Sequence, residues 1–472
     1  MLIKFGTDGW RGIIADDFTF DNVRFCAQGV AEHLHAAGTA HQGLVIGYDT
    51  RFASEDFAAA AAEVLAANGI RVFLCPRPAP TPVISYGVVV LKAAGAIIIT
   101  ASHNPAQWNG FKIKSADGAS APTETEQDVE SRLGRIITEN RVKRLSLEEA
   151  SSQRMVEHFD PDPAYFDQLS RLLDLDGLRR AGMKVAVDSM YGAGAGYFQR
   201  ILQGSRTRVT EINGERNPIF PGIQPEPIGR HLSKLCETVK ETGASIGLAT
   251  DGDSDRIGAV DEHGSPLTPL QLFALLALYL LDVKGERGPM VKTITTSSMI
   301  FRLGELYDVP VYETRVGFKH VAPVMMSQNA IIGGEESSGF GFRGHLPERD
   351  ALVAGSYLLD FMGKTGKTPS ELIEYLYSKV GSHHYLRDDL HFPPEQRRSI
   401  IERLSSQTPS RIAGTEVVKV NTLDGYHFTL ADGSWLLCRL SGTEPILRIY
   451  AEAPTVERAA ELINDGRRIL GV

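Results

Sequence analysis

The chain has 472 residues, and its 49 Lys and Arg against 58 Asp and Glu give a formal net charge of −9. This length suggests about three or four domains, and the acidic balance argues against nucleic acid or an anionic membrane as a partner. Hydrophobic residues at 43% and charged residues at 23% are typical of a soluble globular protein. Because the net charge is negative, any anionic small ligand must be held by local cations.

The pattern of cysteines indicates a reducing compartment, and the apolar runs give no membrane span. No C-x-x-C pair occurs, so we expect buried thiols rather than a disulfide framework or a zinc site. The longest apolar run, residues 270–281, is shorter than the ~20 residues of a membrane span, and we expect a core helix there. The motif at residues 5–12 leaves no room for a secretory signal, so we expect a cytoplasmic protein. The cysteines are Cys26, Cys75, Cys236 and Cys438.

A β-α-β rhythm begins near residue 43. An apolar run at 44–51 (LVIGYDTR) is followed by an Ala-rich helical stretch at 57–68 and a second apolar run at 70–75 (IRVFLC). The run AIIIT at 96–100 is apolar throughout, as a strand buried on both faces must be. These patterns predict a parallel sheet flanked by helices.

The same rhythm returns further along the chain, at 184–188 and 245–249 and again between 291 and 334. After about residue 381 the pattern changes to a helix near 394–405 and alternating runs around a D-G turn, which is typical of an antiparallel α+β domain. We therefore predict an α/β protein, with three similar α/β domains of mixed or parallel sheets plus a C-terminal α+β domain. Polar stretches at 138–153 and 261–266 place the first boundaries, and the expected domains are residues 1–145, 146–262, 263–378 and 379–472.

Ser102 is the first candidate catalytic residue. It follows the run 96–100 within TASHNP, so its hydroxyl is expected at the carboxyl end of a strand, where open α/β sheets bind their ligands. A Ser in a polar loop is more often only a turn residue. The hydrolase alternative needs a G-x-S-x-G elbow, but Ala101 and His103 flank this serine. A hydrolase serine is therefore disfavoured.

Three carboxylates, those of Asp251, Asp253 and Asp255, alternate in DGDSDR after another buried run. Hard oxygen ligands crowded on one loop suit Mg²⁺ or Ca²⁺. An EF-hand would need Gly at its sixth position, where Arg256 stands, so calcium storage is disfavoured. Arg256 would instead suit a phosphate bound beside the metal. For the motif taken alone, a solvated turn remains the alternative.

Two glycine-rich motifs do not fit nucleotide binding. YGAGAGYF at 191–198 has G-x-G-x-G spacing instead of the dinucleotide fingerprint, and it predicts a tight turn into a helix. GKTGKT at 363–368 has Phe361 where a P-loop needs its first glycine, and it predicts the end of a helix followed by a turn.

Two further loops offer polar groups to a ligand. GEESSG at 334–339 mixes carboxylates and hydroxyls, which suits sugar hydroxyls. RLSGTEP at 439–445 combines an arginine, hydroxyls and a glycine, which suits phosphate. Each loop alone is more often a capping loop. Arg11 and Lys112 lie in GWRGI and NGFKIK, which mean little by themselves.

Taken in order, FGTDGWRG, TASHNP with NGFK, DGDSDR, GEESSG and RLSGTEP resemble the signature motifs of the α-D-phosphohexomutase superfamily, the phosphoglucomutase and phosphomannomutase enzymes. The motifs span positions 5 to 445 and fall in all four predicted domains. The resemblance implies four domains around a central cleft, with a small phosphosugar as the ligand. It also implies Mg²⁺ as a cofactor and a hexose 1,6-bisphosphate as activator and intermediate.

Matched motif by motif, the resemblance makes Ser102 the phosphoserine. It makes Asp251, Asp253 and Asp255 the ligands of Mg²⁺, which they share with the phosphoryl group on Ser102. A phosphoserine carries roughly −1.5 to −2 charge. Three carboxylates would repel that charge strongly without a divalent cation between them, so the assignment is physically consistent.

The resemblance also places Lys112, Arg11 and His103 as catalytic residues near the reacting hydroxyl, with Lys112 as the candidate general acid and base. For that role the pKa of Lys112 would have to fall from its reference value of ~10.4. We expect Arg11, Arg256 and Mg²⁺ to lower it.

The remaining assignments concern the substrate. One phosphate site must accept either end of the bisphosphate as the bisphosphate turns around. The fourth domain must therefore bind it less tightly during the turn, and we expect a hinge at 363–381. The expected sugar-binding residues are Arg256, Glu335, Ser337 and Lys319. The expected phosphate-binding residues are Arg439, Ser441, Gly442, Thr443 and Arg448.

The sugar preference is predicted from the loop that follows residue 334. Phe340 follows GEESSG, whereas several dual-specificity phosphomannomutases and phosphoglucosamine mutases carry His in this loop. This form, with VGFKH at 316–320, favours glucose phosphates. The alternatives are a phosphomannomutase or dual enzyme, a phosphoglucosamine mutase and, more remotely, a non-catalytic phosphosugar-binding protein. We expect a monomer or a homodimer.

The segment GHLPERD at 344–350 is expected to be an ordinary helix-entry loop. Arg349 or His345 within it is a lesser candidate for the cleft.

Overall fold

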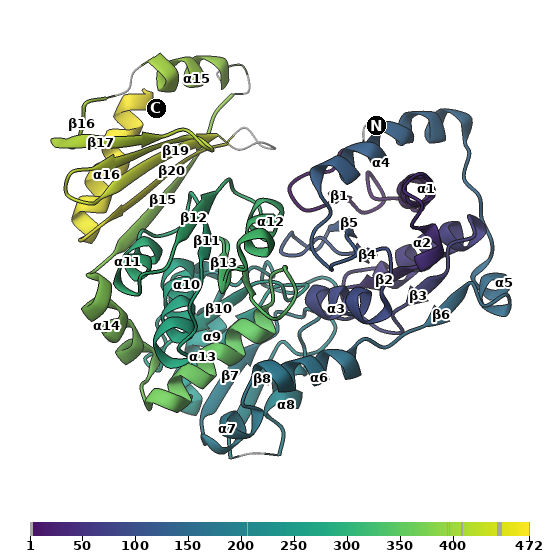
Figure 1. Cartoon of the computed structure of the whole chain (residues 1–472), viewed down its shortest axis with the longest axis horizontal. Coiled ribbons are helices and arrows are strands. Elements are labelled where there is room, and N and C mark those ends of the chain that lie inside the picture. The colour runs from purple at the N-terminus through teal and green to yellow at the C-terminus, as the bar shows by residue number, and fades with distance from the viewer. Residues whose placement is uncertain are drawn as a thin grey trace.

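The computed structural model describes residues 3–204, 206–393, 395, 397–406, 409–440 and 446–471. Within these ranges, no helix combines the length and the apolar character needed to cross a membrane. Figure 1 shows the sheets following one another along an arc, with the first domain at one end and the fourth at the other. The predicted architecture of three α/β domains and a C-terminal antiparallel domain is confirmed.

The first sheet has six strands in the order β1-β5-β4-β2-β3-β6. Strands β2, β3 and β4 are parallel, as their apolar runs predict. Strand β5 pairs antiparallel with both β4 and β1, which brings the NGFK and GWRG motifs beside TASHNP. The elements are β1 Trp10–Ile13, α1 Phe20–Ala36, η1 Ala40–Gln42, β2 Leu44–Tyr48, α2 Ser54–Ala67, β3 Val72–Leu74, α3 Thr81–Leu91, β4 Ala96–Ile99, β5 Trp108–Lys114, α4 Thr123–Glu139, α5 Leu147–Ser152 and β6 Val156–His158.

Strand β6 carries the first sheet beyond the boundary expected at residue 145. It pairs in parallel with β3 at the sheet edge. The polar stretch 138–153 does not leave the domain, because α5 begins at a capping box formed by Ser146 and Glu149 and returns the chain to the sheet.

The second sheet has the order β10-β9-β7-β8, in which β7 is parallel to both β8 and β9. Strands β9 and β10 pair antiparallel, and the loop between them carries DGDSDR. The elements are α6 Asp162–Leu172, α7 Leu175–Arg180, β7 Lys184–Asp188, α8 Tyr197–Leu202, β8 Arg208–Ile212, η2 Gly229–His231, α9 Ser233–Thr242, β9 Ile246–Thr250 and β10 Ile257–Val260.

The third sheet has the order β12-β11-β13-β14, and the antiparallel pair of β13 and β14 carries GEESSG in its loop. Helix α10 is buried in a core shared by the second and third domains, as its apolar run predicts. The elements are α10 Pro269–Leu278, η3 Tyr279–Val283, β11 Met290–Thr293, α11 Met299–Leu306, β12 Val311–Thr314, α12 Phe318–Gln328, β13 Ile332–Gly334, β14 Phe340–Phe342, α13 Ala351–Thr365 and α14 Pro369–Val380.

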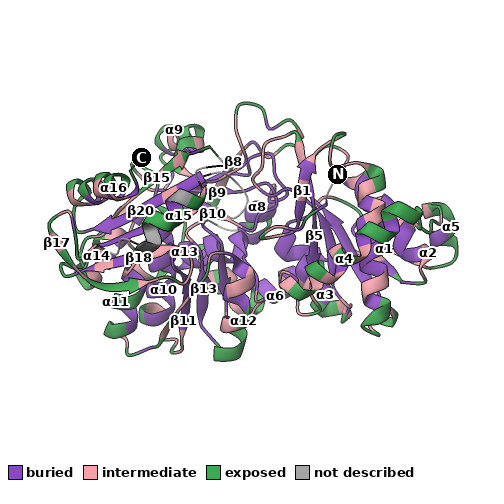
Figure 2. Cartoon of the chain, turned by 90° about the horizontal axis from the view of Figure 1, so that it is seen from above, coloured by how far each residue is buried: buried purple, intermediate pink, exposed green. Residues whose placement is uncertain are grey.

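The fourth sheet is antiparallel throughout, in the order β15-β20-β19-β18-β17-β16. Helix α16 packs against it over a separate apolar core. Figure 2 shows buried residues concentrated in the strands, with exposed residues on the outer faces of helices such as α1 and α16. The elements are β15 His384–His391, α15 Arg397–Ser406, β16 Arg411–Ile412, β17 Thr415–Asn421, β18 Tyr426–Leu430, β19 Trp435–Leu440, β20 Ile446–Ala453 and α16 Val456–Leu470.

The segment 363–381, where a hinge is expected, is largely helical. Helix α13 ends at Gly366, whose φ of 69° is left-handed, so the predicted helix end and turn are confirmed. Helix α14 fills most of the remainder and begins at a capping box formed by Thr368 and Glu371. Gly381, with φ of 84°, then leads into β15 and the fourth domain.

Candidate active site

Ser102 lies just beyond the carboxyl end of β4, where the sequence places it. Its side chain is buried, and its backbone has a φ of 50°, which is uncommon for a residue with a Cβ atom. Thr100 stabilises this turn, because its Oγ1 accepts a 2.8 Å hydrogen bond from the N–H of Ser102. The same hydroxyl donates to Oδ2 of Asp49 at 2.6 Å. The turn directs the Ser102 hydroxyl towards the second domain.

Arg51 holds the loop that carries Ser102, and nothing in the sequence indicates this role. Its side chain is fully buried, and its Nε lies 3.2 Å from Oδ2 of Asp49. Its guanidinium satisfies carbonyl oxygens that would otherwise be buried without a partner. It donates hydrogen bonds to the carbonyls of Ser102 at 2.7 Å, Asn104 at 2.6 Å, Pro105 at 2.9 Å and Trp108 at 2.9 Å.

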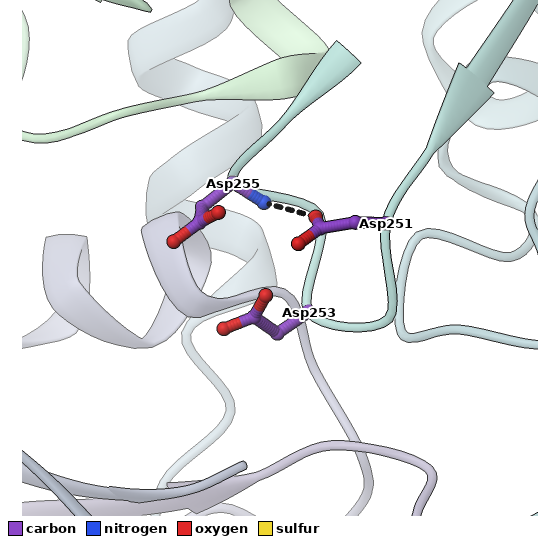
Figure 3. A group of neighbouring side chains, drawn as sticks. All are labelled: Asp251, Asp253 and Asp255. Carbon is purple, nitrogen blue, oxygen red and sulfur yellow. Dashed lines mark hydrogen bonds between the residues drawn. The ribbon is translucent and has the colours of Figure 1, made fainter. Parts of the chain in front are cut away.

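The three aspartates of DGDSDR are buried on the loop between β9 and β10 (Figure 3). One carboxylate oxygen from each lies within 4.8 Å of the others. The N–H of Asp255 donates to Oδ1 of Asp251 at 3.0 Å, which keeps the loop closed (Figure 3). A Cβ atom at Gly252 would lie 2.5 Å from the carbonyl oxygen of Ser102, so glycine is required where the two loops meet.

The electrostatics of this cluster favour a bound cation. Burial, together with the charges of Asp253 and Asp255, raises the pKa of Asp251 well above its ordinary value. The Oδ1 atoms of Asp253 and Asp255 are buried and accept no hydrogen bond from the described part of the chain. Leaving such buried oxygens without a hydrogen bond is costly. The donor set therefore fits a hard divalent metal ion.

Lys112 extends from β5 into the same cluster. Its Nζ lies 2.8 Å from Oδ2 of Asp253, 2.8 Å from Oδ2 of Asp8 and 3.4 Å from Oδ2 of Asp255. The expectation that its pKa is lowered is wrong for this arrangement. Burial acts to lower the pKa of Lys112, but the charges of Asp253, Asp8 and Asp255 outweigh burial and raise it.

Arg11 and His103 lie beside Ser102, as the resemblance implies. The Nη1 of Arg11 donates to the side-chain oxygen of Asn104, two residues beyond the serine. The Nδ1 of His103 lies 3.2 Å from Oγ of Ser102. Burial, and then the charges of Arg256 and Arg11, hold the pKa of His103 well below its ordinary value. The imidazole is therefore neutral and a weaker base than an ordinary histidine.

Arg349, a lesser candidate in the sequence, lies inside the carboxylate cluster. Its side chain is buried, and its Nη2 lies 2.8 Å from Oδ2 of Asp8 and 2.9 Å from Oδ2 of Asp255. Its Nη1 lies 3.8 Å from Oε2 of Glu335. Carboxylates of the first, second and third domains thus share one guanidinium. The expectation of an ordinary helix-entry loop is wrong for this residue.

His345 does not join the cluster. Its Nε2 lies 2.8 Å from Oδ2 of Asp350, which also accepts a 2.7 Å hydrogen bond from the hydroxyl of Tyr165. The other oxygen of Asp350 caps helix α13 by accepting from the N–H groups of Leu352 at 2.9 Å and Val353 at 3.0 Å. This part of the segment is the expected helix entry.

The candidate sugar-binding residues lie on loops that border the cluster. Oε1 of Glu335 accepts a 3.0 Å hydrogen bond from the N–H of Gly317. Burial raises the pKa of Glu335, although Arg349 acts against it. Ser337 and Arg256 are both partly exposed.

Lys319 faces the first domain instead. Its Nζ donates to the carbonyl of Gly6 at 3.1 Å and lies 3.4 Å from Oε2 of Glu126. In this arrangement the ammonium links the third domain to the first, and sugar binding by Lys319 stays a prediction.

The candidate phosphate-binding arginines lie on the fourth sheet. Arg439 of β19 and Arg448 of β20 are directly paired across the ladder, so both side chains project from the same face. The Nε of Arg439 lies 3.0 Å from Oδ2 of Asp424, and the Nε of Arg448 lies 3.7 Å from Oδ2 of Asp389. Ser441, Gly442 and Thr443, also predicted to bind phosphate, lie outside the described residues.

The order of the four domains agrees with comparisons of the chain with known proteins. Four models described as Phosphoglucomutase/phosphomannomutase match along the chain: alpha/beta/alpha domain I at residues 2–140, domain II at 163–264, domain III at 268–380 and the C-terminal domain at 403–468. The chain belongs to the phosphoglucomutase/phosphomannomutase family. The resemblance inferred from the motifs is thereby confirmed.

Relatives of this phosphohexomutase carry different names. A "Probable phosphoglucosamine mutase" of Methanothermobacter thermautotrophicus is 33% identical, over 96% of this chain and 95% of its own length. A "Phosphoglucomutase/phosphomannomutase" of Thermococcus kodakarensis is 31% identical, over 99% and 98% of the two chains. The crystal structure of a "putative phosphomannomutase" from Thermus thermophilus is 35% identical and superposes with a TM-score of 0.87 over 100% of both chains. The chain is therefore a mutase, an isomerase of the phosphohexomutase family.

Proposed function

We propose that this protein is a Mg²⁺-dependent phosphohexomutase that moves a phosphoryl group between C1 and C6 of a hexose phosphate. The group passes through a phosphoserine at Ser102 and a hexose 1,6-bisphosphate. One observation carries the proposal: the Ser102 hydroxyl donates a 2.8 Å hydrogen bond to Oδ2 of Asp251, inside the three-carboxylate cluster. A nucleophile held against a metal site is the arrangement that phosphoryl transfer through a serine needs.

The metal ligands in this proposal are Asp251, Asp253 and Asp255, together with the phosphoryl group on Ser102. When bound there, Mg²⁺ supplies charge neutralisation for the transferring phosphoryl group. The protein's own contribution is to position the hydroxyl. The left-handed turn at Ser102 and the four carbonyl contacts of Arg51 fix the loop before any ligand arrives.

The proton chemistry is assigned to residues beside Ser102. Lys112 keeps its proton against Asp8 and two metal ligands, so it is assigned as the acid that donates a proton to the leaving sugar oxygen. To act as the base for the attacking hydroxyl it must first lose that proton, which the surrounding carboxylates oppose. Arg11 and Arg349 contribute positive charge near the transferred group. His103 lies beside the serine, with its neutral imidazole 3.2 Å from Oγ.

Substrate binding is divided between two domains in this proposal. Glu335, Ser337 and Arg256 bind the sugar side, with Lys319 able to join them if it leaves Gly6. Arg439 and Arg448, together with 441–443, bind the phosphate that is not reacting. The same two arginines accept either end of the bisphosphate. The fourth domain releases it for turning by moving on the segment 363–381.

Glucose phosphates are the first choice of substrate, because Phe340 follows GEESSG, whereas several dual-specificity phosphomannomutases and phosphoglucosamine mutases carry a His in this loop. A second candidate is an amino-sugar phosphate. It is supported by relatives described as phosphoglucosamine mutases, among them the protein of Methanothermobacter thermautotrophicus.

The test is the mass of the intact protein and of its Ser102 peptide, before and after incubation with glucose 1-phosphate, Mg²⁺ and a trace of glucose 1,6-bisphosphate. A phosphate on Ser102 that exchanges with substrate, while glucose 6-phosphate forms, is the expected result. The same assay with mannose and glucosamine phosphates ranks the sugars by kcat/KM. An unmodified Ser102 with no turnover of any of the three sugars would overturn the proposal.

A further inference from the structure

Two chains of polar contacts connect the candidate sugar loop of the third domain with the two arginines of the fourth. The first passes through the loop at 315–317. Glu335 accepts from the N–H of Gly317 at 3.0 Å, and the N–H of the preceding residue, Val316, donates to Oδ2 of Asp424 at 3.0 Å. The same oxygen of Asp424 lies 3.0 Å from Nε of Arg439, an ion pair without the angle of a hydrogen bond.

The second chain begins at the neighbouring residue of the sugar loop, Glu336. Its Oε1 accepts from Nη1 of Arg387 at 3.0 Å and from the hydroxyl of Tyr385 at 3.2 Å, both on β15. Arg387 forms a two-pronged contact with Asp389, in which Nε and Nη2 each donate at 2.7 Å. Asp389 is paired with Arg448 across the ladder, 3.7 Å from its Nε.

The two chains end on arginines that need external support. Arg439 and Arg448 face each other on adjacent strands, so their like charges repel unless carboxylates or a bound anion lie between or beside them. Asp424 and Asp389 supply that negative charge from opposite sides of the pair. The turn that carries Asp424 has little freedom, because a Cβ atom at Gly425, with φ of 103°, would lie 2.6 Å from the carbonyl oxygen of Cys438.

We infer that Asp424 and Glu336 are positioning residues that couple the sugar loop to the phosphate-binding arginines. Glu336 holds Arg387 only while the fourth domain rests against the third. Asp424 belongs to the fourth domain, as does its partner Arg439, and only in this arrangement does the N–H of Val316 from the third domain also hold it. Glu335 and Glu336 are adjacent, so a sugar that orders their loop also orders both chains. The inference rests on the proposed function of these loops. It adds how the sugar-binding loop and the phosphate-binding arginines take up their binding positions together.

The partial exposure of these contacts is compatible with repeated separation of the fourth domain from the third. The side chains of Glu336 and Arg387 are 17% and 33% exposed, and those of Asp424 and Arg439 are 23% and 14% exposed. Ion pairs in contact with water are individually weak. The pair of Glu336 with Arg387, which joins the two domains, can therefore break each time the fourth domain releases the bisphosphate and re-form when it closes. Fully buried pairs, such as Lys114 with Glu348, would resist that motion.

The experiment compares Asp424→Asn and Glu336→Gln with the matched control Asp432→Asn. Asp432 is a carboxylate of the same domain that pairs with Arg458 at 3.2 Å, away from both chains. The affinities for glucose 6-phosphate and for inorganic phosphate are measured by calorimetry, and KM and kcat by turnover. Small-angle scattering then reports whether added glucose 6-phosphate makes the protein more compact.

We expect each of the two variants to weaken phosphosugar binding and raise KM by about tenfold, with a smaller effect on kcat. Ligand-induced compaction should be reduced in both, while Asp432→Asn behaves like wild type. Asp424→Glu should restore part of the affinity, which a merely structural defect would not allow. Glu336→Gln, at a partly exposed site, keeps the test decisive if Asp424→Asn does not fold.

Values for Asp424→Asn and Glu336→Gln equal to those of Asp432→Asn, in a wild-type protein that binds and turns over substrate, would overturn the inference. A wild-type protein that turns over no hexose phosphate would instead overturn the proposed function. In that case the affinity for inorganic phosphate still decides whether the two carboxylates position the arginines.

Discussion

The hydroxyl of Ser102 and the carboxylate of Asp251, 149 positions apart in the chain, are joined by a 2.8 Å hydrogen bond between the first and second domains. Both groups are buried, and the N–H of Asp255 holds the other oxygen of Asp251. This contact brings the serine to the carboxylates without help from a ligand. A phosphate on Ser102 would bring roughly −1.5 to −2 charge into the same space.

We therefore predict that Mg²⁺ stabilises the phosphorylated protein more than the unphosphorylated one. At free Mg²⁺ a hundred times its Kd, the gain in unfolding free energy is about 2.7 kcal/mol. Asp251→Asn should remove most of this gain. Thermal unfolding of both phosphorylation states, with Mg²⁺ and with chelator, measures it. Asp261→Asn is the control, because this carboxylate only closes the turn after β10. Equal Mg²⁺ effects in the two variants would contradict the metal assignment.

A second prediction concerns Arg51, which has no exposed surface. Arg51→Met leaves Asp49 as an unpaired buried charge and strips the carbonyls of the Ser102 loop of their donor. We expect the free energy of unfolding to fall by about 3–5 kcal/mol and turnover to fall with it. Denaturant unfolding provides the measurement. Arg71→Met breaks an exposed pair with Glu157 and should cost less than ~1 kcal/mol. Similar losses in the two variants would refute this account.

A third prediction follows from the pKa of Glu126, which burial raises from 4.5 to about 7 although Lys319 acts against it. Between these values the folded chain keeps a proton that the unfolded chain has released. The free energy of unfolding should therefore fall as pH rises through this window and stay constant above it. The total loss is about 1.4 kcal/mol for each unit of pKa shift. Glu126→Gln does not titrate, so its stability relative to wild type should rise between pH 5 and pH 8.

Denaturant midpoints at the two pH values test this point. Glu124→Gln, an exposed position on the same helix, is the control and should follow wild type. A Glu126→Gln variant whose pH dependence equals that of wild type would mean that Glu126 ionises normally in the folded protein.

The parts of the site that lie within one motif could be predicted from the sequence. Asp251, Asp253 and Asp255 follow a buried strand at alternating positions, so local geometry alone brings their carboxylates together. Ser102 is placed in the same way by the strand before it. These positions could be predicted because each depends only on the few residues of the strand and loop that carry it.

Contacts between domains could not be predicted in this way. Asp8 and Arg349 are 341 positions apart and meet only when the first and third domains pack together. The predicted sign of the pKa shift of Lys112 was wrong because the prediction considered only nearby cations. In the structure Lys112 contacts the carboxylates of Asp253 and Asp255, and also that of Asp8, which the sequence did not place there. The boundary expected at residue 145 leaves strand β6 out of the first domain for a similar reason. β6 pairs with β3 at the edge of the first sheet, and no local sequence pattern reveals that pairing.

The last prediction concerns Arg349, whose guanidinium lies 2.8 Å from Asp8, 2.9 Å from Asp255 and 3.0 Å from Glu348. Arg349→Met leaves several buried carboxylates facing one another, so we expect about 3–5 kcal/mol of lost stability and at least tenfold lower kcat. Arg349→Lys keeps the charge but loses the planar fork that serves several carboxylates at once, and it should recover stability more than kcat.

Denaturant unfolding and steady-state kinetics at saturating Mg²⁺ separate the two effects. Arg343→Met is the matched control, because Arg343, just before the segment 344–350, pairs with Glu286 and is 29% exposed. If Arg349→Lys restored kcat fully, charge alone would be sufficient at this position. If Arg349→Met kept both wild-type stability and wild-type kcat, the guanidinium would not be what joins the carboxylates of the three domains.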